Sequence, residues 1–136
     1  MVLGENLEGL RQNTNRVRKQ VLIADDSQSS RDLVRFILKR SGCDVIEAQD
    51  GEQALALALE FIPDLFILDL NMPKLDGYFV ASELRKQAPF IQTPIVALSA
   101  SVAQTDSARI ATAGFSAFLT KPIRPASLRK CISQLL

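Results

Sequence analysis

From Val21 onward the sequence alternates short apolar runs with longer amphipathic segments, and this alternation limits the fold more than any other feature. The apolar runs are typical of buried strands, whereas the segments between them carry apolar residues at helical spacing. Strands are expected at 21–24, 45–46, 65–68, 95–98 and 115–120, and helices at 33–40, 53–61, 77–87, 102–113 and 128–135. Because right-handed crossovers place helices on both faces of a parallel sheet, the pattern predicts a doubly wound α/β fold.

Two segments carry more specific expectations. The run at Val45 and Ile46 is the least apolar of the strands, which suits the edge of the sheet. Ser101 and Gln104 have the spacing of a capping box, so a helix of mostly small residues is expected to begin there and to bury little.

Composition excludes several kinds of protein. The chain of 136 residues contains no histidine, which rules out Ser-His-Asp catalysis, histidine zinc ligands and a phosphohistidine donor role. Cys43 and Cys131 are far apart and are expected to be buried thiols. A net charge of +1 does not favour nucleic acid as a direct partner. No apolar segment reaches the roughly 20 residues of a membrane span, and no export signal is visible.

The first 19 residues differ from the rest because they are rich in Asn, Gln and Arg. We expect a polar tail or linker at 1–19, followed by one domain at 20–136. Leu3, Leu7 and Leu10 have helical spacing within that tail, which would allow a short amphipathic helix to dock on a neighbour.

Polar residues follow the apolar runs at the points where the strands are expected to end. They are Asp25, Asp26, Asp69, Ser99 and Lys121. In parallel α/β sheets these ends share one edge, where ligands bind at the topological switch point. Two carboxylates about 5 Å apart repel by roughly 3 kcal/mol at an effective dielectric constant near 20. Such a cluster therefore indicates a bound cation or a retained proton, and oxygen ligands favour Mg²⁺, with Mn²⁺ as the alternative.

A carboxylate beside a divalent cation and a lysine is suited to attack phosphorus and form an aspartyl phosphate. Asp69 is the best candidate nucleophile, since it ends a central strand and precedes an exposing turn. Asp26 is better placed as a metal ligand with Asp25 beside it, and Ser99 is able to donate a hydrogen bond to the same oxyanion.

These residues and their order resemble the receiver domain of two-component response regulators over about residues 20–136. The resemblance rests on five elements in order: Asp25-Asp26, Leu68 to Pro73, Asp76-Gly77, Ser99-Ala100 and Lys121-Pro122. It implies a flavodoxin-like five-stranded sheet in the order 2-1-3-4-5. It also implies a cis peptide before Pro122, a cytoplasmic location, and a phosphoacceptor that assists its own phosphoryl transfer and hydrolysis rather than an enzyme.

The resemblance also assigns roles to individual residues. Asp69 would accept a phosphoryl group from a histidine kinase or phosphotransfer protein, with Lys121 pairing with that group. Asp25, Asp26, Asp69 and the backbone carbonyl of Asn71 would bind the metal ion. Ser99 and Phe118 would act as the switch pair, changing the affinity for a protein partner on the last helix–strand–helix face.

Two other functions use the same fold. A pseudo-receiver, which is an interaction module without phosphorylation, would be expected to lack one of the acids or the lysine. A small phosphohydrolase would carry a second acid two positions after its nucleophile, where Asn71 stands here. The sequence leaves open whether the receiver is a free-standing regulator or part of a hybrid kinase.

Overall fold

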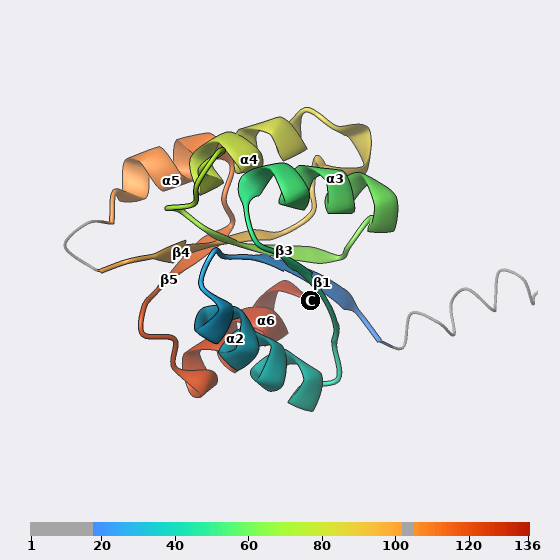
Figure 1. Ribbon diagram of the computed structural model, residues 1–136, viewed down its shortest axis with the longest axis vertical. Helices are drawn as coiled ribbons and strands as arrows, with labels where there is room; N and C mark the ends of the chain where they lie inside the picture. The colour runs from blue at the N-terminus through green and yellow to red at the C-terminus, as the bar shows by residue number, and fades with distance from the viewer. Residues whose placement is uncertain (1–17, 102–104) are drawn as a thin grey trace, which may run out of the picture.

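The computed structural model of the chain describes residues 18–101 and 105–136, and its centre is a five-stranded parallel sheet (Figure 1). The strand order is β2-β1-β3-β4-β5, so the predicted fold class and strand order are confirmed. The strands are β1 (Gln20–Ala24), β2 (Asp44–Ala48), β3 (Leu65–Asp69), β4 (Ile95–Ser99) and β5 (Ala117–Thr120).

Helices cover both faces of the sheet. On one face lie α2 (Gln28–Arg40) and α6 (Pro125–Leu135), and on the other lie α3 (Gly51–Phe61), α4 (Gly77–Arg85) and α5 (Ser107–Ala113) (Figure 1). A 3₁₀ turn, η1 (Ala88–Phe90), follows α4. This two-sided covering explains why the central strands are continuous apolar runs instead of alternating ones.

Two hydrophobic clusters form the core, one on each side of the sheet. Along β1, Leu22 and Ala24 point to the cluster under α3, α4 and α5, whereas Val21 and Ile23 point to the cluster under α2 and α6. Every residue of β1 from Val21 to Ala24 is fully buried, as are the apolar residues of β3 and β4. These central strands therefore hold the carboxyl edge of the sheet in place.

The helix α5 begins later than predicted. It starts at Ser107, with the Asp106 side chain accepting a hydrogen bond from the backbone N–H of Arg109 at 3.1 Å. The prediction that Ser101 caps this helix was wrong, because Asp106 takes that place and the Ser101 carbonyl is engaged by the Thr105 hydroxyl at 2.8 Å. Gln104 lies outside the described residues. Ile110 is the one buried residue among the described residues of this helix, so the helix buries little, as its composition predicted.

Three smaller predictions can be compared with the structure. The strand β2 lies at the edge of the sheet, as predicted. The last strand starts at Ala117 and not at Phe115, since the Phe115 ring packs against Tyr78 in the core. Both Cys43 and Cys131 are buried free thiols, as expected.

The N-terminal segment 1–17 lies outside the described residues, and so does the predicted helix with Leu3, Leu7 and Leu10. The first described residue, Arg18, pairs with Asp44 at 2.9 Å and donates a hydrogen bond to the Cys43 carbonyl at 3.2 Å. The domain boundary at residue 20 stays a prediction. Among the helices that the structure describes, none is both long and apolar enough to cross a bilayer.

Candidate functional site

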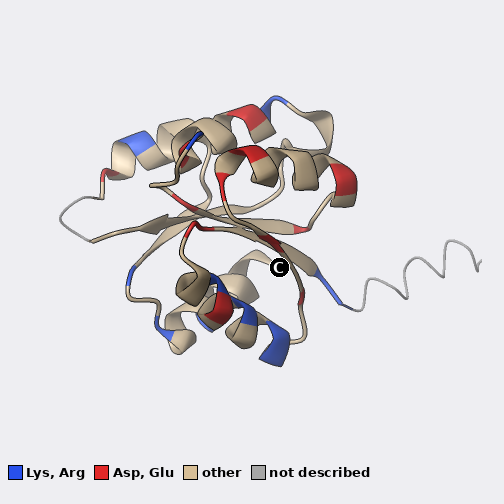
Figure 2. Ribbon diagram, viewed as in Figure 1, with Lys and Arg blue, Asp and Glu red and all other residues tan. Residues whose placement is uncertain are grey.

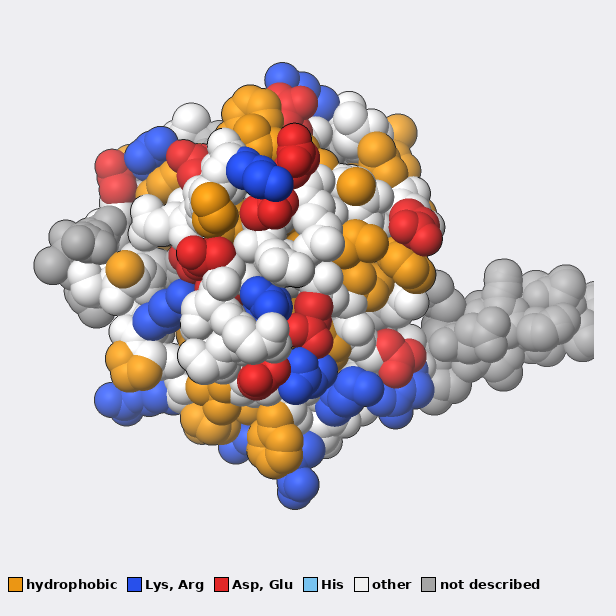
Figure 3. Space-filling model, viewed as in Figure 1, with side chains coloured by type: hydrophobic (Ala, Val, Ile, Leu, Met, Phe, Trp, Pro, Cys, Tyr) orange, Lys and Arg blue, Asp and Glu red, His pale blue; other side chains and the backbone are white. Residues whose placement is uncertain are grey.

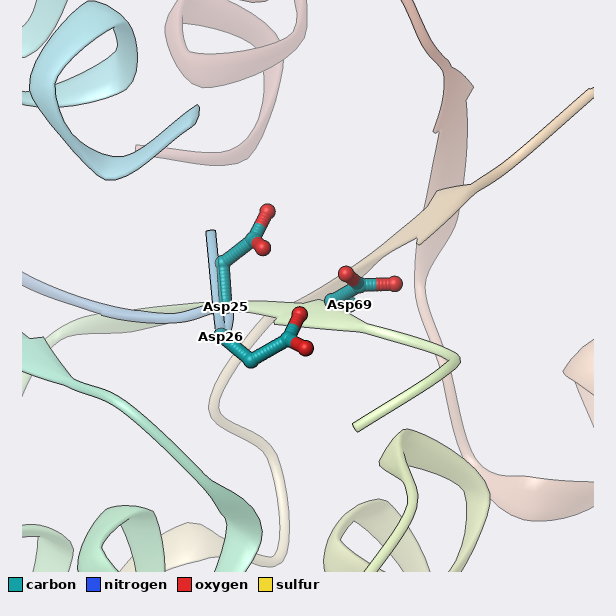
Figure 4. Close-up of side chains that lie close together, drawn as sticks. All are labelled: Asp25, Asp26 and Asp69. Atoms are coloured by element: carbon teal, nitrogen blue, oxygen red, sulfur yellow. The ribbon is translucent and has the colours of Figure 1, made fainter. Parts of the chain in front are cut away.

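The carboxyl edge of the sheet brings three acidic side chains together. Asp25 and Asp26 directly follow β1, and Asp69 is the last residue of β3, the neighbouring strand (Figure 4). Each offers one carboxylate oxygen, and the three oxygens lie within 4.8 Å of one another. Asp25 and Asp69 are buried, whereas Asp26 is exposed at the mouth of the cluster. The convergence expected from the strand ends is therefore present.

Lys121 supplies the positive charge of this cluster from the residue after β5. Its Nζ atom lies 3.0 Å from Asp25 Oδ2 and 3.0 Å from Asp69 Oδ2. The Lys121 side chain retains 25% of its exposure, while that of Asp69 retains 7%. The ammonium group therefore neutralises part of the carboxylate charge and still borders solvent.

Burial and mutual contact shift the pKa values of Asp69 and Lys121. Burial, followed by the negative charge of Asp25, raises the pKa of Asp69 above the ordinary value of 3.8 against the opposing hydrogen bonds from Asn71 and Lys121. Burial alone would lower the pKa of Lys121, but its contacts with Asp25 and Asp69 raise it above 10.5. Lys121 is therefore a fixed cation at neutral pH.

Backbone groups orient the two buried carboxylates. The N–H of Ser27 donates to Asp25 Oδ1 at 2.9 Å, and the N–H of Asn71 donates to Asp69 Oδ1 at 3.0 Å. One oxygen of each carboxylate is therefore hydrogen-bonded to the backbone of the turn that follows its strand. Asp25 Oδ2 accepts no well-aligned hydrogen bond from the described residues, and the Lys121 ammonium group at 3.0 Å balances its charge.

The carboxylate oxygens gathered here fit a divalent cation. Three acids face one ammonium group, so the cluster keeps negative charge that a cation would balance. Hard cations prefer carboxylate and carbonyl oxygens, and these are the atoms gathered here. Asp25, Asp26 and Asp69 therefore suit Mg²⁺ or Mn²⁺, and Asn71 lies in the turn that follows Asp69.

Arg31 supports the site although the sequence reasoning did not identify it. This buried residue of α2 donates a hydrogen bond to the Asp25 carbonyl at 2.7 Å and pairs with Glu47 at 3.2 Å. Its position three residues before Val34 and seven before Leu38 places an arginine on the buried face of the helix. A charged residue within an apolar stripe was the signal that could have revealed it.

Gly77 lets α4 approach the phosphoacceptor candidate closely. A Cβ atom at this position would lie 2.4 Å from the Asp69 carbonyl oxygen and 3.0 Å from Leu70 Cα. Only a residue without a side chain therefore allows this approach of α4 to the end of β3. Met72 is buried in the core, and the Lys121-Pro122 peptide is cis, as the resemblance implied.

The candidate switch residues lie on the strands beyond β3, with Ser99 at the end of β4 and Phe118 in β5. Ser99 Oγ lies 3.1 Å from the Ser101 carbonyl and 2.9 Å from Thr105 Oγ1, both in the loop before α5. Phe118 keeps 40% of its exposure, so it is not an ordinary core phenylalanine. It borders a groove of about 380 Å³ lined by residues of α5 such as Ser107 and Ile110.

Acidic and basic side chains are interspersed over the face of the molecule that Figures 2 and 3 show. Lys74 in the loop before α4 pairs with Asp50 and Glu52, each at 3.5 Å. These pairs are more exposed than the Lys121 pairs and so contribute less to stability. The chemistry of the edge therefore centres on Asp25, Asp69 and Lys121.

Comparisons with known proteins agree with this geometry. The family model of the response regulator receiver domain matches residues 21–133. Protein PilG of Pseudomonas aeruginosa is 36% identical over 109 residues, which cover 80% of this chain and 81% of PilG. The transcriptional regulatory protein PhoP of Bacillus subtilis is 38% identical over 120 residues, or 88% of this chain. The chain spans 49% of PhoP and 13% of the sensor histidine kinase CheAY of Helicobacter pylori.

Solved structures give the same result. The chemotaxis response regulator CheY4 of Vibrio cholerae matches with a TM-score of 0.83 and 33% identity, covering 88% of this chain and 99% of CheY4. The receiver domain of a Pseudomonas aeruginosa sensor histidine kinase, solved with a magnesium ion in its active site cleft, matches with a TM-score of 0.80 and 29% identity. That match covers 87% of this chain and 97% of the other. The chain therefore belongs to the response regulator receiver domain family.

Proposed function

We propose that this receiver domain is a cytoplasmic phosphoacceptor of a two-component system or phosphorelay, with Asp69 as the phosphorylated residue. The observation that carries the proposal is the contact of one ammonium group, Lys121 Nζ, with both Asp25 and Asp69 at 3.0 Å. A pseudo-receiver gains no support, since the acids and the lysine are all present and gathered in one place.

In the proposed reaction, an Asp69 carboxylate oxygen attacks the phosphorus atom of a partner phosphohistidine. The new O–P bond forms as the P–N bond breaks, and the imidazole leaves with the electron pair and takes up a proton. Mg²⁺, held by Asp25, Asp26, Asp69 and the Asn71 carbonyl, would supply charge neutralisation when bound. Lys121 would balance the remaining charge on the phosphoryl oxygens.

The chain's own residues fit this step in two further ways. The backbone N–H of Asn71 holds Asp69 Oδ1, which leaves Oδ2 beside the ammonium group as the atom to be phosphorylated. The reaction modifies the chain itself and uses no separate substrate pocket, so we propose a signalling module and not an enzyme. Hydrolysis of the aspartyl phosphate would return the domain to its unphosphorylated state.

A change in affinity for a protein partner would follow from the negative charge of the phosphoryl group. A phosphoryl group brings roughly −1.5 to −2 charges and strong hydrogen-bond acceptors. We propose that it draws in the Ser99 hydroxyl, and that Phe118 turns toward the groove beneath α5. The face made of α5, β5 and α6 would then change its affinity for a protein partner. The donor would be a histidine kinase or a phosphotransfer protein.

The test is intact-mass measurement after incubation with acetyl phosphate and Mg²⁺. The wild type is expected to gain one labile phosphoryl group, and Asp69→Asn is expected to gain none. An adduct of equal size and lability on both proteins would refute Asp69 as the phosphoacceptor. Asp32→Asn, which alters an exposed carboxylate of α2 outside the acidic cluster, is the matched control and should gain the adduct as the wild type does.

A further inference from the structure

The loop between β4 and α5 holds the Ser99 hydroxyl in a small hydrogen-bond network. Ser99 Oγ lies 2.9 Å from Thr105 Oγ1 and 3.1 Å from the Ser101 carbonyl oxygen. Thr105 Oγ1 in turn donates to the same Ser101 carbonyl at 2.8 Å. Ser99 is 1% exposed, so water does not compete freely for its hydroxyl.

The number of hydroxyl protons in this network limits which acceptors the Ser99 hydroxyl can reach. Each hydroxyl carries one proton. Both hydroxyls donate to the Ser101 carbonyl, or one of them donates to it and receives the proton of the other. In every arrangement the proton of Ser99 is engaged within the loop. A phosphoryl oxygen on Asp69 receives that proton only when the hydrogen bond from Ser99 to the loop breaks.

Thr105 lies just before α5, the helix that is expected to move when Asp69 is phosphorylated. It directly precedes Asp106, the N-cap of α5. The bond between Ser99 and Thr105 therefore joins the end of a central strand to the beginning of this helix. When the bond breaks, the N-terminal end of α5 loses its link to the sheet edge.

The opposite end of α5 is held by Arg85 of α4. Its guanidinium donates two hydrogen bonds to the Gly114 carbonyl, at 3.0 and 2.8 Å, and one each to the carbonyls of Phe90 and Thr93, at 2.6 and 2.7 Å. A charged, multiply bonded guanidinium is a stronger anchor than one neutral hydroxyl pair. Movement of α5 is thus expected at its N-terminal end.

We infer that Thr105 is a positioning residue that restrains the Ser99 hydroxyl until Asp69 carries a phosphoryl group. This inference rests on the proposed function, because it supposes that Ser99 serves that group. Breaking the restraint would cost part of the free energy of phosphoryl binding. Removing the Thr105 hydroxyl leaves Ser99 only its bond to the Ser101 carbonyl, and should therefore strengthen binding at Asp69 by the part of the restraint that Thr105 supplies.

The test compares Thr105→Val, which removes the hydroxyl and keeps the shape, with Thr105→Ser, which keeps the hydroxyl. The probe is beryllofluoride with Mg²⁺, which bonds to a carboxylate oxygen in place of a phosphoryl group. Tyr78 is the only tyrosine, the chain has no tryptophan, and the Arg109 guanidinium of α5 lies 3.7 Å from the centre of its ring. Tyrosine fluorescence therefore reports on α5 during the titration.

Thr105→Val should lower the half-saturating concentration about 2- to 10-fold, as expected for one net hydrogen bond, and Thr105→Ser should match the wild type. Thr112→Val is the control: its hydroxyl donates to the Ala108 carbonyl on the same helix at 2.8 Å, and its removal should change nothing. In a Ser99→Ala background, Thr105→Val should have no further effect.

A second readout needs neither metal nor probe. In the untreated protein, Thr105→Val should speed hydrogen exchange at the amide of Ile110, in the first turn of α5, and leave that of Phe115 unchanged. Equal binding by Thr105→Val and the wild type, weaker binding by the variant, or the same change in Thr105→Ser would overturn the inference. If the wild type itself fails to bind beryllofluoride, the proposed function fails, whereas the exchange measurement still tests the restraint.

Discussion

Lys121 Nζ donates a hydrogen bond to Asp69 Oδ2 at 3.0 Å and thereby links the ends of β5 and β3, two strands that β4 separates in the sheet. The same ammonium group reaches Asp25, which follows β1. One flexible side chain therefore connects the ends of three strands. Its long aliphatic stem makes this possible, because the charged end can cross a neighbouring strand.

Lys121→Met should lower the free energy of unfolding in Mg²⁺-free buffer at pH 7. Without the ammonium group, Asp25 and Asp69 repel each other in a buried setting. We expect a loss of about 1–3 kcal/mol, below the value for a fully buried pair because Lys121 is partly exposed. Urea unfolding measures the change. Lys86→Met, which removes an exposed pair with Glu83, should alter stability by less than about 0.5 kcal/mol; equal losses in the two variants would contradict the prediction.

Asp25→Asn and Asp26→Asn should each weaken Mn²⁺ binding by about 10-fold or more, since each removes one charged oxygen ligand from the proposed metal site. Electron paramagnetic resonance of free Mn²⁺ measures the dissociation constant directly. Asp32→Asn is the comparison, because this acid of α2 lies outside the cluster and pairs with Arg35. Binding that is unchanged in Asp25→Asn would show that the metal is held elsewhere.

Gly77→Ala should disturb the site through the backbone alone. The new methyl group would have to displace the Asp69 carbonyl, with an overpacking cost of about 1–3 kcal/mol and weaker Mn²⁺ binding. Gly42→Ala offers a useful contrast, since no atom lies within 4 Å of its added Cβ and only the positive φ of +87° resists the change. Gly42→Ala should reduce stability and leave Mn²⁺ affinity unchanged, and a similar loss of affinity in both variants would argue against a local effect.

The two cysteines should resist modification in the folded protein. Burial raises the pKa of Cys43 and of Cys131 above 9.0, which keeps both thiols protonated at pH 8. Labelling with a disulfide reagent should therefore be slow in buffer and fast in denaturant. Because the folded state binds these protons more tightly than the unfolded state, stability should fall as the pH rises above about 9. Rapid labelling of Cys131 at pH 8 without unfolding would show that the C-terminal helix opens locally.

The sequence alone determined the fold class and most of the site. Short continuous apolar runs between amphipathic segments are typical of central strands covered on both faces, so the alternation predicts a doubly wound α/β fold. The architecture then places Asp25, Asp69 and Lys121 at one edge, because parallel strands end on the same side. These conclusions need only the chain order and the periodicity.

Only the tertiary structure decided which atoms of Asp25, Asp69 and Lys121 contact one another. No local pattern shows that Lys121 contacts both Asp25 and Asp69, because the contacts span strands that are distant in the sequence. The start of α5 was misplaced for a related reason: Ser101 and Thr105 are drawn into bonds at the end of β4, leaving the cap to Asp106. Capping propensity is a local preference of about 1 kcal/mol, and contacts with a distant residue readily outweigh it.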